Sequence, residues 1–257
     1  MSIWQKGTEF LARALRLDLT HSQTRYARLL RRTVLPGTRW LEVGCGRQVA
    51  PDWAMPLEQQ RQIVSAARLL VGLDVDPAIH DHPLLSERVI ALCGALPFRA
   101  ESFDLVTANM VVEHIREPRP FLDDIRRVLR PGGRFLFHTA NYLHYLVLLA
   151  SLTPDWLKKR IVWMLERRRA ADVFPTFYRM NTASRIRGLA RESGFEVESI
   201  VVGGSVTAFT RLGPVAWLEC FALKAMASLS GGRLSSNLLV ILRKRDGPAE
   251  ALTRSTP

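Results

Sequence analysis

Two glycines and an aspartate occupy positions from which a ligand with a ribose could be held. Gly44 and Gly46 flank a cysteine in "LEVGCGRQ", directly after a short apolar run. Residues without a Cβ let the backbone turn sharply and let a ligand approach it closely. A second apolar run, "LLVGLDV", carries Asp74 near its end, where a carboxylate can accept both hydroxyls of a ribose. A tight turn and a solvated acid would also explain these residues, as we expect for Asp76 beside Pro77.

The neighbours of the glycine loop argue against a diphosphate ligand. In pyrophosphate-binding loops a third glycine allows close helix packing beneath the diphosphate, but Gln48 stands where that glycine is expected. Glu42 would repel a phosphate and would instead favour a cation such as an ammonium or a sulfonium. Asp74 also follows Gly46 by more than the ~20 residues usual in a dinucleotide fold, which predicts a loop insertion around "VAPDWAMP".

Strands that alternate with helices must position these residues. The helical spacing of apolar residues and the short apolar runs predict helices over 4–17, 22–34, 56–70 and 119–130, and strands over 38–43, 69–75, 87–92, 102–109 and 134–140. Because the strands are almost continuously apolar, they are expected to form a parallel sheet with helices on both faces. Beyond them we expect a helical block over 142–170, helices over 182–193 and 214–229, and strands over 195–202 and 237–245.

In these segments the sequence resembles the class I S-adenosylmethionine-dependent methyltransferases, and within them the small-molecule branch with quinone-biosynthesis and sterol-type enzymes. "LEVGCG" matches the glycine loop of that family, "VGLDVDP" its ribose-binding acid, and Leu96–Phe137 its most specific stretch. The likeness covers 38–140 well and "MNTASRIRGLARESGFEVESI" more loosely. It implies an α/β fold, a seven-stranded doubly wound sheet with an added helical cover. The last strand would be antiparallel and inserted beside the fifth.

The resemblance also implies S-adenosylmethionine as the cofactor and gives roles to single residues. Its methionine part would lie along the glycine loop, its ribose on the acid of the second strand, and its adenine beside the next residue. The acid that often precedes "LPF" in the family is missing from "LCGALPF", which leaves a cysteine or the backbone near it to meet the adenine. The residues expected at the cofactor are Glu42, Gly44, Gly46, Asp74, Val75, Cys93, Asn109 and Met110.

Methyl transfer needs little from a protein, because a sulfonium is already electrophilic and alignment does most of the work. A base helps if the acceptor is a hydroxyl or an acidic carbon, and His114 in "VVEHI" is the candidate. A histidine in such a loop could equally cap or pack. The fifth strand and "FPTFYRMN" offer an acceptor pocket made of His138, Asn141, Tyr178 and Arg179.

The formal net charge of +12, from 36 basic and 24 acidic residues in 257, predicts an anionic partner or a solvated basic surface. The apolar stretches Tyr142–Leu152 and Pro214–Leu229, the first with basic residues clustered beside it, favour an anionic membrane surface and a small, hydrophobic or lipid-like acceptor. The same stretches could instead only cover the active site. Three cysteines without metal-site spacing and a polar N-terminus predict a cytoplasmic protein without a bound metal.

Two other functions remain open at this stage. A nucleic-acid methyltransferase would suit the charge, but "ANMV" follows the fourth strand instead of a catalytic tetrapeptide of the N-P-P-Y kind. A non-catalytic module that binds S-adenosylmethionine would suit the missing third glycine and adenine acid. The expected organisation is N-terminal helices over 1–36, a methyltransferase domain over 37–245 with a helical insertion at about 142–180, and a loose tail over 246–257.

Overall fold

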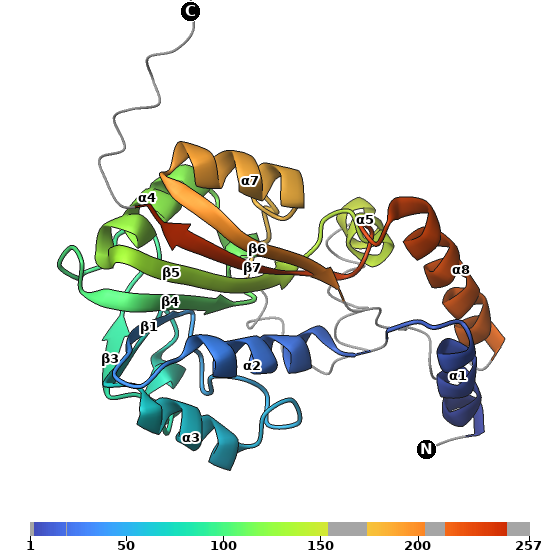
Figure 1. Ribbon diagram of the computed structural model, residues 1–257, viewed down its shortest axis with the longest axis horizontal. Coiled ribbons are helices and arrows are strands. Elements are labelled where there is room, and N and C mark those ends of the chain that lie inside the picture. The colour runs from blue at the N-terminus through green and yellow to red at the C-terminus, as the bar shows by residue number, and fades with distance from the viewer. Residues whose placement is uncertain (1–2, 19, 154–173, 204–213, 246–257) are drawn as a thin grey trace, which may run out of the picture.

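A mixed sheet of seven strands lies at the centre of the computed structural model, which describes residues 3–18, 20–153, 174–203 and 214–245 (Figure 1). The strands are β1 Arg39–Val43, β2 Leu69–Asp74, β3 Glu87–Ile90, β4 Phe103–Asn109, β5 Leu129–Ala140, β6 Phe195–Gly203 and β7 Asn237–Lys244. Their order is β3-β2-β1-β4-β5-β7-β6. The first five strands are parallel, and β7 is antiparallel to both β5 and β6. The predicted fold class and the inserted last strand are therefore confirmed.

Helices cover both faces of the sheet because the strand residues alternate between two apolar cores. Trp40 points to the core that Leu30 of α2 and Ile63 of α3 complete. Leu41, its neighbour on β1, points to the other core, which includes Phe121 of α4 and further residues of α7. The helices are α1 Ile3–Ala14, α2 Ser22–Thr33, α3 Leu57–Ala66, α4 Pro118–Val128, α5 Tyr145–Leu152, α7 Ala183–Glu192 and α8 Pro214–Ser230, with short helices η1 Pro77–Asp81 and η2 Val112–His114.

The predicted loop insertion is present after the glycine loop, and strand β5 starts earlier than the sequence predicts. The predicted insertion separates Gly46 from the start of α3 at Leu57, and buried Val49 and Met55 anchor it. Strand β5 starts at Leu129, whereas the sequence predicts a start at residue 134 after a break at Pro131. Instead of ending the helix-to-strand connection, the segment around Pro131 lies within β5. The pairing of β5 with β4 shifts in register there, between Phe103 and Leu105 of β4.

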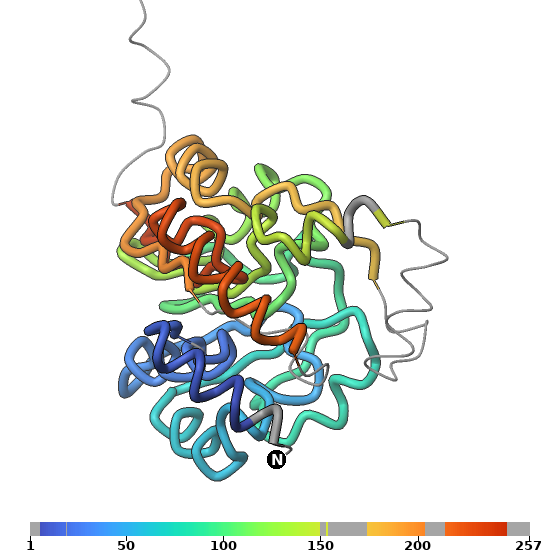
Figure 2. The backbone as a smooth tube through the Cα atoms, turned by 90° about the vertical axis from the view of Figure 1, so that its right-hand side faces the viewer, coloured from blue at the N-terminus to red at the C-terminus, as the bar shows by residue number. Residues whose placement is uncertain are grey.

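Helices α1, α5 and α8 lie beyond the end of the sheet to which β4 and β5 point (Figure 1). Helices α1 and α8 run side by side in both views (Figures 1 and 2). In the described part of the chain, the helices are all too short or too polar to cross a bilayer. Most of the expected insertion at 142–180, its basic residues Lys158–Arg160 and Arg167–Arg169, and the tail lie outside the described residues.

Candidate active site

The glycine loop and Asp74 form one hydrogen-bonded unit at the carboxyl ends of β1 and β2. The Gly46 N–H donates to Asp74 Oδ2 at 2.8 Å, and the Asp76 N–H donates to Asp74 Oδ1 at 2.9 Å. Gly44 and Gly46 have φ angles of +65° and +53°, which L side chains rarely adopt. A Cβ at Gly44 would lie 2.4 Å from Val111 Cγ2. Backbone conformation therefore favours glycine at both positions, and packing requires it at Gly44.

Glu42 is a buried acid beside this loop. Its side chain is 1% exposed, and its Oε2 finds no hydrogen-bond partner among the described residues. Burial, together with the charge of Asp74, raises the pKa of Glu42 to about 8. A buried carboxyl group with an unpaired oxygen can bind a cationic group. The ion pair then offsets the cost of removing the ionised carboxylate from water. The amino group of the methionine part of S-adenosylmethionine is a cationic group of this kind.

A cavity of about 590 Å³ opens at the carboxyl ends of β2 and β4. Six of the residues singled out in the sequence line it, namely Gly44, Asp74, Val75, Cys93, Met110 and His114. Most of the remaining wall is apolar, with Leu92, Ile115, Phe121 and Phe174 among its members. A concave, mostly apolar site with a few convergent polar groups is typical of small-molecule binding. Glu42, Gly46 and Asn109 lie next to this wall in the chain but are not part of it.

Cys93 lies in the segment before "LPF", in which the family often carries an acid and this chain has none. Burial and the nearby Asp74 raise the pKa of the Cys93 thiol to about 11, so it is neutral at physiological pH. A neutral thiol is a weak hydrogen-bond donor and acceptor, and it replaces a carboxylate poorly as a partner for an amino group. The chemistry of Cys93 therefore gives little support to a direct hydrogen bond between this side chain and the adenine.

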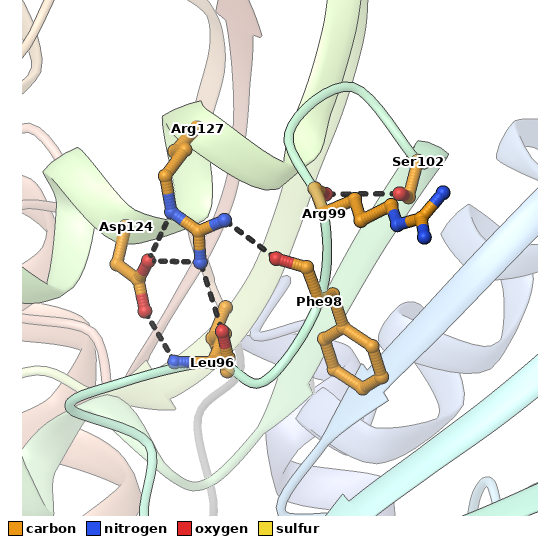
Figure 3. A network of polar contacts seen from close by, with 6 residues as sticks. All are labelled: Leu96, Phe98, Arg99, Ser102, Asp124 and Arg127. Carbon is orange, nitrogen blue, oxygen red and sulfur yellow. Dashed lines mark hydrogen bonds and ion pairs between the residues drawn. The ribbon is translucent and has the colours of Figure 1, made fainter.

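The segment after Cys93 is held in place by two residues of α4 (Figure 3). Asp124 Oδ2 accepts a hydrogen bond from the Leu96 N–H at 2.5 Å. Arg127 donates to the carbonyl oxygens of Leu96 at 2.8 Å and Phe98 at 2.5 Å, and pairs with Asp124 at 2.6 Å. The sequence analysis missed this pair, because an aspartate and an arginine three residues apart on a helix usually form a solvated ion pair.

His114 lies on the cavity wall in a tautomer that suits a base. Its Nδ1 is 2.9 Å from the carbonyl oxygen of Pro175. Since a carbonyl only accepts hydrogen bonds, this contact places a proton on Nδ1, and in the neutral ring Nε2 then carries the lone pair. The ring of Phe174, 6.1 Å away between centroids, borders the same part of the cavity.

Asn109 and His138 face the opposite side of the sheet, toward α2. His138 Nδ1 lies 2.9 Å from Asn109 Oδ1, and Asn109 Nδ2 donates to Gln23 Oε1 at 3.0 Å. The His138 ring stacks on Tyr26 at 5.8 Å between centroids, and burial lowers the pKa of His138 to about 3. The chain thus places His138 in a neutral polar layer under α2 instead of in the cavity. Gln23 and Tyr26 were not predicted, and their polar side chains on the inner face of a helix are the signal that could have indicated them.

The other predicted acceptor residues also lie outside the cavity. Asn141 Nδ2 donates to the carbonyl oxygens of Arg233 at 2.9 Å and Ser235 at 2.7 Å, so the side chain ties β5 to the turn before β7. Tyr178 has a positive φ of +52°, and its ring lies 5.6 Å from that of Tyr142 between centroids. Arg179 is exposed to solvent. None of the three contributes to the described wall of the cavity.

A family model described as "Methyltransferase domain" matches residues 19–200, which include the glycine loop, the cavity and α7. The chain belongs to this family. The match confirms the resemblance found in the sequence, and S-adenosylmethionine is the methyl donor that the family implies.

Similar proteins carry related names. A Mycolicibacterium smegmatis protein named a probable S-adenosylmethionine-dependent methyltransferase is 32% identical over 178 residues, 67% of this chain and 57% of that relative. The chain thus spans little more than half the length of this relative. A ubiquinone biosynthesis O-methyltransferase of Pseudomonas putida (strain F1) is 26% identical over 177 residues, 66% of this chain and 69% of the relative.

Solved structures support the same fold. An S-adenosylmethionine-dependent methyltransferase from Mesorhizobium loti matches with a TM-score of 0.54 and 17% identity, over 84% of this chain and 96% of that one. The [4+2]-cyclase SpnF matches with a TM-score of 0.51 and 20% identity, over 87% of this chain and 81% of that one. A fold shared with a cyclase does not by itself establish the reaction, so the reaction has to be argued from the site.

Proposed function

We propose that the protein transfers a methyl group from S-adenosylmethionine to a small, hydrophobic or lipid-like acceptor. The observation that carries the proposal is the single cavity that joins Gly44 and Asp74 to His114 within a largely apolar wall. The relative named for ubiquinone biosynthesis O-methylation supports a small-molecule acceptor. The net charge suggested a nucleic-acid acceptor, but the described wall of the cavity carries Arg116 as its one arginine or lysine and has no basic stripe to follow a phosphate backbone.

The residues of the chain have separate tasks in this proposal. Asp74 accepts the ribose hydroxyls of the cofactor, and Glu42 pairs with its amino group. When bound, the cofactor supplies an electrophilic methyl group on a sulfonium. His114 Nε2 takes the proton of an acceptor hydroxyl or acidic carbon, while its Nδ1–H stays on the Pro175 carbonyl. The apolar wall excludes water and aligns the acceptor, which supplies most of the rate enhancement.

The proposal extends to the rest of the chain. Helices within 1–36 and an insertion at about 142–180 would cover a methyltransferase domain over 37–245, followed by the tail over 246–257. Because a lipid-like acceptor partitions into a bilayer, the protein would work at an anionic membrane surface.

Methyl transfer can be tested with S-adenosylmethionine that carries a labelled methyl group. The protein is incubated with this donor and an organic-solvent extract of cells, and the label is counted in the organic phase. The proposal predicts label in the organic phase with the wild type and a large loss with His114→Ala. Label found only in nucleic acid, or transfer that is equal in both proteins, would contradict it.

A further inference from the structure

Helix α8 presents an apolar face to solvent. Its side chains Val215, Leu218, Phe221 and Leu229 are exposed by 45%, 70%, 54% and 90%. With Ala222 and Ala225 they recur at helical spacing and form one stripe, called here the α8 stripe, that contains no charged residue. A contiguous exposed apolar surface of this kind marks an interaction site, whereas single exposed apolar residues do not.

The opposite face of α8 fixes the direction in which the stripe points. Glu219 and Cys220 are buried, and the Glu219 carboxylate accepts a hydrogen bond from the Tyr145 hydroxyl of α5. Trp217 packs on α1 so closely that a Cβ at Gly7 would lie 3.2 Å from its ring. Rotating the stripe inward would expose the buried Cys220 and Leu223 and break these contacts. The stripe is therefore a stable feature of the surface.

Basic residues accompany the apolar surface. On α1, beside α8, the exposed Phe10 lies between exposed Lys6 and Arg13 on one helical face. Lys224 on α8 and the exposed Arg233 just after it add further positive charge. Apolar side chains bordered by basic ones are typical of helices that lie in the interface of an anionic bilayer, because apolar burial and electrostatic attraction add.

We infer that the α8 stripe and the exposed face of α1 dock on an anionic lipid bilayer. The net charge of +12 favours a lipid surface over a second copy of the chain, since two such copies repel each other while anionic headgroups attract. Helices α1 and α8 lie beyond the end of the sheet to which β4 and β5 point (Figure 1). The inference deepens the proposed function by naming the surface at which a lipid-like acceptor would be met. The binding itself requires neither cofactor nor acceptor.

Sedimentation with vesicles tests the inference, using phosphatidylcholine alone and an equimolar mixture with phosphatidylglycerol, each at low and high salt. The wild type should pellet with the mixed vesicles at low salt and much less at high salt. In Leu218→Glu the partition coefficient onto the mixed vesicles should fall at least about tenfold. The variant replaces an inserted leucine with a negative charge that anionic lipid repels. Leu218 is 70% exposed, so this variant is expected to fold.

Leu35→Glu is the matched control, since Leu35 is 55% exposed before the amino end of β1, at the other end of the sheet. It should pellet like the wild type, and Leu229→Glu should behave like Leu218→Glu. Three results would overturn the inference. These are no pelleting of the wild type with anionic vesicles, equal pelleting of Leu218→Glu and Leu35→Glu, or a lipid-independent dimer that Leu218→Glu abolishes. All three leave the labelled-methyl assay unaffected, so failure of docking is distinguishable from failure of the proposed reaction.

Discussion

The Asp74 carboxylate holds the glycine loop through the Gly46 N–H, 2.8 Å from its Oδ2. The same carboxylate accepts the Asp76 N–H through its other oxygen. Asp74 therefore links the residues proposed for the ribose with those proposed for the methionine part of the cofactor. A change at one of these positions is expected to affect the other.

The two glycines should respond differently to alanine. Gly44→Ala places a Cβ 2.4 Å from Val111 Cγ2 at a φ of +65°, so it should lower stability and cofactor affinity together. Gly46→Ala meets nothing within 4 Å and should cost only the backbone strain, about 1–2 kcal/mol. Urea unfolding and cofactor titration of both variants check this order. A Gly46→Ala variant more damaged than Gly44→Ala would show that the described packing at Val111 is wrong.

Removal of the Arg127 side chain should loosen the segment around Leu96. Arg127→Ala loses two hydrogen bonds to backbone carbonyls and an ion pair, which we expect to lower the free energy of unfolding by roughly 1–3 kcal/mol. Arg119→Ala on the same helix is the control, because its ion pairs with Asp123 and Glu192 are half exposed and each contributes ~1 kcal/mol or less. Equal unfolding free energies for the two variants would count against the role of Arg127.

The sheet and the cofactor end of the site could be predicted from the sequence, because they depend on local patterns. Gly44 and Gly46 follow one apolar strand and Asp74 ends another, and the carboxyl ends of parallel strands meet at one edge of a sheet. His138 could not be placed, since its side of β5 depends on the strand register. The role of Arg127 depends on contacts with a loop far away in the chain. The apolar sequence of α8 could have been buried as easily as exposed, and only packing against α1 and α5 decides this.

The raised pKa of Glu42 predicts a dependence of stability on pH. In the folded chain this pKa is about 8, compared with 4.5 for an unperturbed glutamate, so the folded state keeps a proton that the unfolded state loses. Its contribution to stability is fully present below about pH 4.5 and is lost as the pH rises through 8. His138, whose pKa is lowered to about 3 from 6.5, has the opposite effect below pH 6.5. The effect of Glu42 is therefore separated from that of His138 between about pH 6.5 and pH 8.

In that window Glu42→Gln should flatten the pH profile of the free energy of unfolding, by up to about 1.4 kcal/mol per pH unit. Urea unfolding of both proteins across the window measures the difference. If the amino group of the cofactor pairs with Glu42, binding at neutral pH should also release a proton. Calorimetry in two buffers with different ionisation enthalpies detects that proton. Parallel pH profiles for the two proteins would argue that Glu42 is ionised in the folded chain.

His114→Ala should lower the rate of methyl transfer by about 10²–10⁴-fold if the histidine is the general base. Its affinity for S-adenosylhomocysteine should stay close to that of the wild type, because the ring faces the apolar part of the cavity beside Phe174. Single-turnover transfer and cofactor titration separate the two effects. Loss of cofactor binding without a slower transfer step would indicate a packing role for His114.

Calorimetric titration with S-adenosylmethionine tests the central claim most directly, using the wild type, Asp74→Ala and Asp76→Ala. The two aspartates lie two residues apart, but Asp76 only caps η1 through the Ala78 N–H at 2.8 Å. We expect one cofactor per wild-type chain, a loss of ~1–3 kcal/mol of binding free energy in Asp74→Ala, and little change in Asp76→Ala. Absence of binding to the wild type, or equal affinities in the two variants, would contradict the assignment of this cavity to the cofactor.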